Sequence, residues 1–227
     1  NKQALISQIL ENHWHHLKQN EIYNISAMLT DVSSGEVLAY VGNVGYFDNK
    51  NGGSVDMIHA RRSTGSILKP ILYASCLDDG LILPGTLLPD VPTYFGDYSP
   101  QNYSLNYSGA VSASEALIRS LNVPTIRLLS KYGQPKFYNK LINLGYSTLD
   151  RPASHYGLSI ILGGAETNIW DLSSIYSGMA RTLNEYVLND GQYVPHNYRP
   201  VRLINKAFNK KLKPEPFGLL SAASIYE

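Results

Sequence analysis

The chain has 227 residues, 44% of them hydrophobic, and a formal net charge of +1 at pH 7. This length suits one large domain or two small ones, and the hydrophobic content is ordinary for a packed globular core. The small net charge gives no electrostatic case for nucleic-acid binding, and no run of like charges marks a membrane-surface segment. No apolar stretch approaches the roughly 18 residues of a membrane span. The single cysteine, Cys76, excludes an internal disulfide and is interpreted as a packing residue.

The N-terminal third is expected to hold a helix, a hairpin and a loop. Residues 3–19 carry apolar side chains at helical spacing, which predicts an amphipathic helix. Residues 23–31 and 36–42 are strand-like and are separated by a turn that contains a glycine, so they predict a hairpin. Residues 42–62 are rich in Gly, Asn and Asp, which predicts a loop.

Helices are expected to dominate the middle of the chain. A helix that starts near Ser66 is closed by Gly80. A long connection rich in Pro, Gly and Tyr then covers residues 81–110, and a connection of this length in a compact domain is usually functional. Further helices are expected at 112–119, 124–133, 135–145 and 167–182, followed by short strands within 193–203.

Ser66-Ile-Leu-Lys69 places a hydroxyl and an amine three residues apart at the start of a predicted helix. Both then lie on one helix face, where the amine can take the hydroxyl's proton. Lys69 can act as a base only if burial lowers its pKa below the ~10.4 of a free lysine. Because a bare Ser-x-x-Lys pattern is expected about once by chance in a chain of this length, the pattern alone does not identify a catalytic site.

Ser120-Leu-Asn122 is the second motif, and Ser104-Leu-Asn106 repeats it. Only the copy at 120 lies between a capped helix and one started by Pro124. In the functional interpretation Ser120 relays a proton, and Asn122 hydrogen-bonds the amide carbonyl of a substrate. In the alternative interpretation Asn122 is a helix cap.

The segments around these motifs resemble the transpeptidase domain of class A penicillin-binding proteins, most closely the penicillin-binding protein 1C branch. That family and the β-lactamases use Ser-x-x-Lys, Ser-x-Asn and Lys-Thr-Gly motifs. The similar blocks follow the family order over roughly residues 25–185. They are Ser63-Thr-Gly-Ser-Ile-Leu-Lys-Pro-Ile-Leu-Tyr73, Asp78-Asp-Gly80, Asp90-Val-Pro-Thr93, Phe95-Gly-Asp-Tyr98, Pro100, Asn102, Ser112, Glu115-Ala-Leu117, Ser120-Leu-Asn-Val-Pro124 and Leu162-Gly-Gly-Ala-Glu166.

The resemblance implies an α+β fold of the penicillin-binding protein and serine β-lactamase type, with an antiparallel sheet packed against a mainly helical region. Residues 1–21 are expected to form an N-terminal helix or linker, and residues 22–227 the transpeptidase domain. The family's Lys-Thr-Gly strand supplies half of the oxyanion hole, and that tripeptide is missing from the sequence. We therefore expect the chain to be truncated before this strand, which would weaken acylation by the fragment.

The resemblance also implies a reaction. Ser66 would be acylated by the D-Ala-D-Ala end of a peptidoglycan stem peptide or by a β-lactam, and an amine of a neighbouring stem peptide would resolve the ester. The catalytic residues implied are Ser66, Lys69, Ser120 and Asn122, and we expect Asn122, Tyr98 and Asn102 to contact substrate. Alternatives are a D,D-carboxypeptidase or other serine hydrolase of the same fold, and a non-catalytic β-lactam sensor or scaffold.

The expected location is extracytoplasmic, in the periplasm, with the full protein anchored in the cytoplasmic membrane and fused to a glycosyltransferase domain. We expect no nucleic-acid partner, no cofactor and no metal, because His13, His15 and His16 have no carboxylate or cysteine at ligand spacing. Glu166 is interpreted as a turn or cap residue rather than a general base. For Tyr98, packing within its loop is the alternative to ligand contact.

Overall fold

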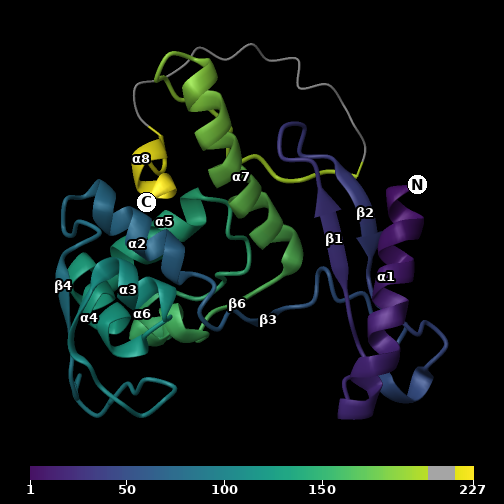
Figure 1. Cartoon of the computed structure of the whole chain (residues 1–227), viewed down its shortest axis with the longest axis horizontal. Coiled ribbons are helices and arrows are strands. Elements are labelled where there is room, and N and C mark those ends of the chain that lie inside the picture. Colours follow the sequence, from purple (N-terminus) through teal and green to yellow (C-terminus); the bar gives the residue numbers. More distant parts are fainter. Residues whose placement is uncertain (204–217) are drawn as a thin grey trace. The chain divides into compact units, whose positions relative to one another are not determined.

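The computed structural model describes residues 1–203 and 218–227 of the chain. Within these residues the chain forms two compact units (Figure 1). The described part of the first unit comprises residues 1–62 and 167–203, and that of the second unit comprises residues 63–166 and 218–227. The mixture of helices and antiparallel strand pairs confirms the predicted α+β class.

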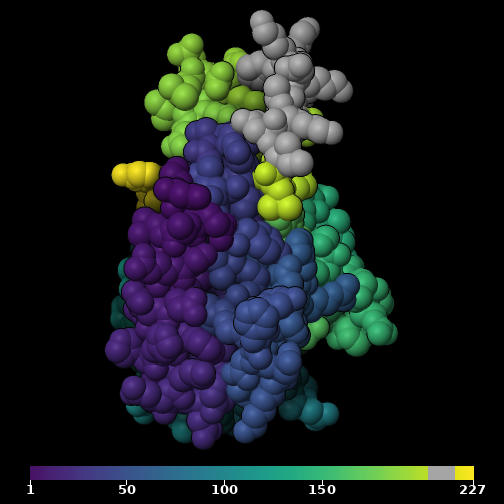
Figure 2. All heavy atoms as spheres, turned by 90° about the vertical axis from the view of Figure 1, so that its right-hand side faces the viewer, coloured from purple at the N-terminus to yellow at the C-terminus, as the bar shows by residue number. Residues whose placement is uncertain are grey.

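The first unit contains a β-hairpin, and each of its two strands contacts one helix. Strands β1 (Ala27–Thr30) and β2 (Val37–Val41) pair antiparallel. Helix α1 (Lys2–Leu17) packs on β2, and α7 (Ile169–Leu188) contacts β1. A one-turn 3-10 helix (Lys18–Asn20) continues α1, and a second 3-10 turn (Asn49–Asn51) lies in the loop after β2. Figure 2 shows the face of this unit on which the purple helix α1 runs beside the blue segment 42–62.

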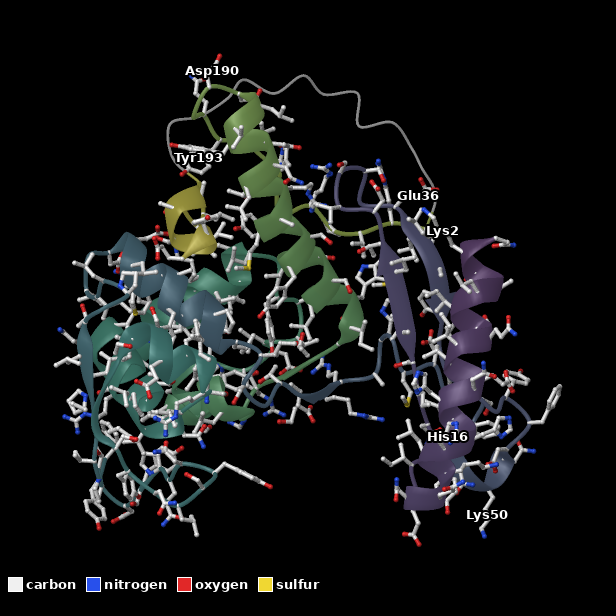
Figure 3. The ribbon with its side chains drawn as sticks, viewed as in Figure 1. Lys2, His16, Glu36, Lys50, Asp190 and Tyr193 are labelled. Atoms are coloured by element: carbon white, nitrogen blue, oxygen red, sulfur yellow. The ribbon has the colours of Figure 1, made fainter. Side chains whose placement is uncertain are left out.

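Trp14 ties α1 to that segment. Its side chain is buried, and its indole Nε1 donates to the Tyr23 carbonyl at 2.8 Å. Gly45 has φ +64°, and a Cβ at this position would lie 2.6 Å from the Trp14 ring, so only glycine allows this approach. The exposed His13, His15 and His16 flank Trp14, and Figure 3 shows His16 near the end of the helix and Lys2 at its start. Among the described residues no group of three or more His, Cys, Asp or Glu side chains is placed to hold a metal ion.

The second unit is mainly helical. Its strands β4 (Leu87–Asp90) and β5 (Gly109–Ser112) pair antiparallel, with Leu87 opposite Ser112. Two strands of two residues, β3 (Arg62–Ser63) and β6 (Glu166–Thr167), lie where the chain passes between the units. The helices are α2 (Lys69–Asp78), α3 (Ala113–Ile118), α4 (Asn122–Tyr132), α5 (Gln134–Asn143), α6 (Ala153–Tyr156), α8 (Ala222–Tyr226) and a 3-10 helix (Gly157–Leu162).

The core of the second unit is built from apolar faces of α2, α4 and α5. Pro70 stands in the first turn of α2, where its missing N–H costs no helical hydrogen bond. Cys76 is fully buried, and burial raises the pKa of its thiol to about 12, which suits a packing role. The side chains with no solvent exposure include Ile71, Leu72, Ile126, Leu129, Phe137 and Leu141.

The structure refines several predicted elements. The hairpin is confirmed, and Ser112 caps α3 by accepting from the Glu115 N–H at 3.2 Å. The expected connection 81–110 contains β4 and the start of β5, because these strands pair with each other across a long loop that sequence periodicity does not reveal. The predicted strands within 193–203 are not formed as extended strands, and Arg202 instead makes an isolated bridge with Glu36. No helix in the described residues is long and apolar enough to span a membrane.

Candidate active site

Ser66 and Lys69 flank the start of α2. Ser66 lies in the turn before the helix and is exposed, whereas Lys69 is the first residue of the helix and only 1% exposed. The Lys69 N–H donates to the Ser66 carbonyl at 3.1 Å, which closes the turn. Helix α2 thus begins at Lys69 rather than near Ser66 as expected, so the two residues do not share a helix face, and the motif places an accessible hydroxyl in the turn before a buried amine.

The Lys69 amine is surrounded by oxygens of residues 120–122. Its Nζ lies 2.6 Å from the Ser120 carbonyl, 3.2 Å from the Ser120 hydroxyl, 3.3 Å from the Leu121 carbonyl and 2.8 Å from Asn122 Oδ1. The Ser66 hydroxyl is not among these contacts. The structure therefore joins Lys69 to both polar residues of the second motif.

Burial changes the acid strength of this amine. Removal from water disfavours the ammonium form and lowers the pKa of Lys69 to about 8. With this pKa, about one tenth of the molecules carry a neutral amine at pH 7, compared with far fewer for a free lysine. Lys69 can thus accept a proton near neutral pH.

Ser120 lies on the bend between α3 and α4, as predicted, whereas Asn122, expected on the same bend, is already the first residue of α4. Ser120 has φ 52°, a left-handed conformation that is strained for a residue with a side chain. This bend points the Ser120 carbonyl and hydroxyl toward the Lys69 amine. The strained backbone of Ser120 thus occurs where it brings two acceptors to the amine.

Asn122 is the first residue of α4, and its side chain is held at both ends. Its Oδ1 accepts from Lys69, and its Nδ2 donates to the Gln101 carbonyl at 2.8 Å. The side chain thus makes tertiary contacts instead of capping its own helix. The repeated motif does not share this arrangement, because the Ser104 hydroxyl is 3.4 Å from the Asn106 N–H within an exposed loop.

The two other expected substrate contacts differ in exposure. Tyr98 is 37% exposed, and burial of the remainder raises the pKa of its phenol. Asn102 is 2% exposed. Its Oδ1 accepts from the Asn122 and Val123 N–H groups, and its Nδ2 donates to Asp90 and to the Asn106 carbonyl. A substrate that binds Asn102 would have to replace one of these contacts.

Sequence reasoning missed the contributions of Asp90 and Gln101. Asp90 is fully buried at the end of β4, and an acidic residue in a segment taken for a loop gave no signal of this burial. Glu166 is exposed in β6, and its carbonyl accepts from the Thr148 hydroxyl at 2.6 Å. Its carboxylate does not cap α7, because Asn168 performs that role.

The chain matches a known family model. Residues 25–181 match the model described as the penicillin-binding protein transpeptidase domain. The chain is 40% identical over 158 residues to penicillin-binding protein 1C of Escherichia coli, an alignment that covers 70% of this chain and 20% of that protein. The chain thus spans about a fifth of the length of the curated relatives it matches.

Solved structures share the fold. A peptidoglycan glycosyltransferase from Burkholderia ambifaria has a TM-score of 0.72 at 16% identity, covering 98% of this chain and 69% of that one. The penicillin-binding protein PonA1 of Mycobacterium tuberculosis has a TM-score of 0.64 at 22% identity, covering 88% and 53%. The expected resemblance to class A proteins of the 1C branch is confirmed. With its motifs, its fold and most of its length in agreement, the chain belongs to the penicillin-binding protein transpeptidase domain family.

Proposed function

We propose that this chain carries the acyl-transfer site of a peptidoglycan D,D-transpeptidase, with Ser66 as the nucleophile. The observation that supports this most is the buried Lys69 amine, which contacts Ser120 and Asn122 and belongs to the residue three positions after the exposed Ser66. A serine hydroxyl needs a nearby base, and an amine with a pKa of about 8 is suited to that task. The family supplies the class of reaction.

In the first step the Ser66 oxygen attacks the carbonyl carbon of the penultimate D-alanine of a stem peptide. The hydroxyl proton passes to neutral Lys69, and the C–N bond to the terminal D-alanine breaks. Ser120, whose hydroxyl lies 3.2 Å from the Lys69 amine, gives its proton to the leaving nitrogen and takes the proton from Lys69 in exchange, so both groups return to their starting forms. The products are an ester on Ser66 and free D-alanine.

In the second step an amine of a neighbouring stem peptide attacks the ester. A new amide forms, the bond to Ser66 breaks, and the proton lost by the attacking amine passes through Lys69 to the Ser66 oxygen. A β-lactam acylates Ser66 in the same way by opening its ring amide. The nitrogen released from the ring amide stays attached to the rest of the drug, so no fragment leaves. The resulting ester on Ser66 carries the mass of the whole β-lactam and can be measured.

The proton transfer requires a rearrangement, because Lys69 contacts residues 120–122 and not the Ser66 hydroxyl. Catalytic hydrogen bonds often form fully only when substrate is bound. We propose that Asn122 then offers its amide to the carbonyl of the substrate and that the partly exposed Tyr98 contacts it. Contact of substrate with Asn102 stays a prediction.

We propose further that the complete protein acts in the periplasm, because peptidoglycan stem peptides lie outside the cytoplasmic membrane. An anchor in that membrane and a glycosyltransferase domain are proposed for the rest of the protein, since this chain covers only 20% of a 1C relative. The division into residues 1–21 and a domain at 22–227 stays a prediction. No metal, cofactor or nucleic acid enters the proposed reaction.

The test is intact-mass spectrometry after incubation with a fluorescent penicillin, followed by peptide mapping. It is run on this chain and on a longer protein that carries it, each with Ser66→Ala and Ser104→Ala variants. We expect one adduct per molecule on the peptide that contains Ser66, lost in Ser66→Ala and kept in Ser104→Ala. An adduct on another residue, or none on the longer protein, would contradict the proposal and favour a non-catalytic relative.

A further inference from the structure

The start of α4 lacks a capping side chain of its own. The first N–H groups of a helix have no partner within the helix and need acceptors from elsewhere. The residue before α4 is Leu121, whose side chain cannot accept a hydrogen bond. Instead, Asn102 Oδ1 accepts from the N–H groups of Asn122 at 3.0 Å and Val123 at 3.2 Å. A side chain twenty residues earlier in the sequence thus caps this helix.

A buried carboxylate fixes the orientation of the Asn102 amide. Asp90 has no solvent exposure, and its Oδ1 accepts from Asn102 Nδ2 at 2.7 Å while its Oδ2 accepts from the Ser108 N–H at 2.8 Å. The Asn106 carbonyl accepts from the same Nδ2 at 3.0 Å. With two acceptors facing its nitrogen, the amide oxygen of Asn102 has to face the helix.

These contacts lead directly to the Lys69 amine. Asn122 receives the Asn102 hydrogen bond at its backbone and presents Oδ1 to Lys69 with its side chain. Ser120, two residues earlier, keeps a left-handed backbone that persists only where its surroundings fix it. The position of Asn122, the first residue of α4, therefore determines the positions of the Ser120 and Asn122 side chains.

We propose that Asn102 and Asp90 are positioning residues for the cluster of Lys69, Ser120 and Asn122. Asp90 orients the Asn102 amide, Asn102 fixes the first turn of α4, and that turn holds the acceptors of the Lys69 amine in place. This proposal rests on the proposed function, and it gives Asn102 a role that acts through Asn122 rather than through substrate.

An exchange of the two side chains tests this role. Asn102→Asp removes the amide donor and brings two carboxylates together, so the support is lost. In the double variant Asp90→Asn with Asn102→Asp, the amide at position 90 can donate to the carboxylate at 102 and still accept from the Ser108 N–H. The carboxylate at 102 still accepts from the two helix N–H groups, and of the contacts of Asn102 only the one with the Asn106 carbonyl is lost. Total charge equals that of the unmodified chain, so the exchange separates geometry from charge.

Two readouts are measured in each variant. Lysine labelled with carbon-13 at the ε position reports the pKa of Lys69 by NMR titration, and a fluorescent penicillin reports the acylation rate. In Asn102→Asp and in the uncharged Asn102→Ala, we expect water to reach the amine and its pKa to rise by about one unit. We expect the acylation rate to fall about tenfold or more as the cluster loses its alignment. The exchange should restore part of both losses, because the contact with the Asn106 carbonyl is not recovered, and Ser104→Ala in the same loop should change neither.

Parent-like values of both readouts in the folded single variants would overturn the proposal. Failure of the double exchange to recover any of what Asn102→Asp lost would also overturn it, including the case where the single variants do not fold. If no form of the protein reacts with penicillin, the proposed function fails while the Lys69 titration still decides the positioning role.

Discussion

Among the described residues, each unit buries one long cationic side chain, and the two cations differ in whether they stay charged at neutral pH. Lys69 in the second unit and Arg181 in the first are both 1% exposed. Backbone carbonyls contact both side chains, and Arg181 donates to those of Asn197 at 2.7 Å, Val32 at 2.9 Å and Arg199 at 3.1 Å. Neither cation forms a salt bridge within the described residues. Both units therefore surround the buried cation with carbonyl oxygens that accept its hydrogen bonds.

The two buried cations differ in their pKa values. Burial lowers the pKa of Arg181 to about 10, with a smaller contribution from the nearby charge of Arg199, so its guanidinium stays charged at neutral pH. Burial lowers the pKa of Lys69 to about 8, so its amine can lose and regain a proton. The same physical effect makes a permanent structural donor of the arginine and a candidate base of the lysine.

The largest expected effect comes from removing the candidate base. Lys69→Met keeps an apolar side chain of similar length and removes the amine, so acylation of Ser66 should slow by about 10²-fold or more, as expected for loss of a general base. Stopped-flow fluorescence with a labelled penicillin measures the rate, and urea unfolding confirms that the variant is folded. Acylation at the unmodified rate would remove Lys69 from the mechanism.

Removing the other cation should affect folding instead. Arg181→Met leaves three carbonyl groups without their donor, so the free energy of unfolding should fall by about 2–4 kcal/mol. Urea denaturation measures this loss. The acylation rate per folded molecule should change less than about twofold, since Arg181 takes no part in the proposed chemistry. Unchanged stability would show that burial alone does not make this cation structural.

An exposed cation provides the smallest effect. Arg119 pairs with Glu115 at 2.8 Å across one turn at the end of α3, and the two side chains are 44% and 50% exposed. Glu115→Gln removes this pair and should lower the free energy of unfolding by only about 0.3–0.5 kcal/mol, less in high salt. A loss comparable to that of Arg181→Met would mean that the contrast between buried and exposed cations is wrong.

The sequence was sufficient to predict the elements built from local pattern. Helical periodicity and the Ser112 cap anticipated α1 and α3, and two strand-like segments around a glycine-containing turn anticipated the hairpin. The motifs also anticipated that Ser120 would lie on a bend. The family followed from the order of short blocks along the chain, which single motifs of two or three residues would not have revealed.

The support of the candidate site could not be predicted in the same way. Asn102 reaches Asn122 across twenty residues, and Asp90 is buried although acidic residues are normally exposed. Such contacts depend on how β4 and the loop after it fold back on α4, which is a tertiary property without a local pattern. The pKa of Lys69 likewise depends on burial, so the candidate base could be identified from the sequence but its acid strength could not.

The pH dependence of Ser66 acylation by a fluorescent penicillin tests the central claim most directly. The ammonium form of Lys69 cannot accept the serine proton, and the neutral form can. Below the pKa of about 8 the rate should therefore rise with pH, about tenfold per unit, and it should level off above that value. A rate that stays constant from about pH 6 to pH 10 in the folded protein would show that the Lys69 amine does not act as the base.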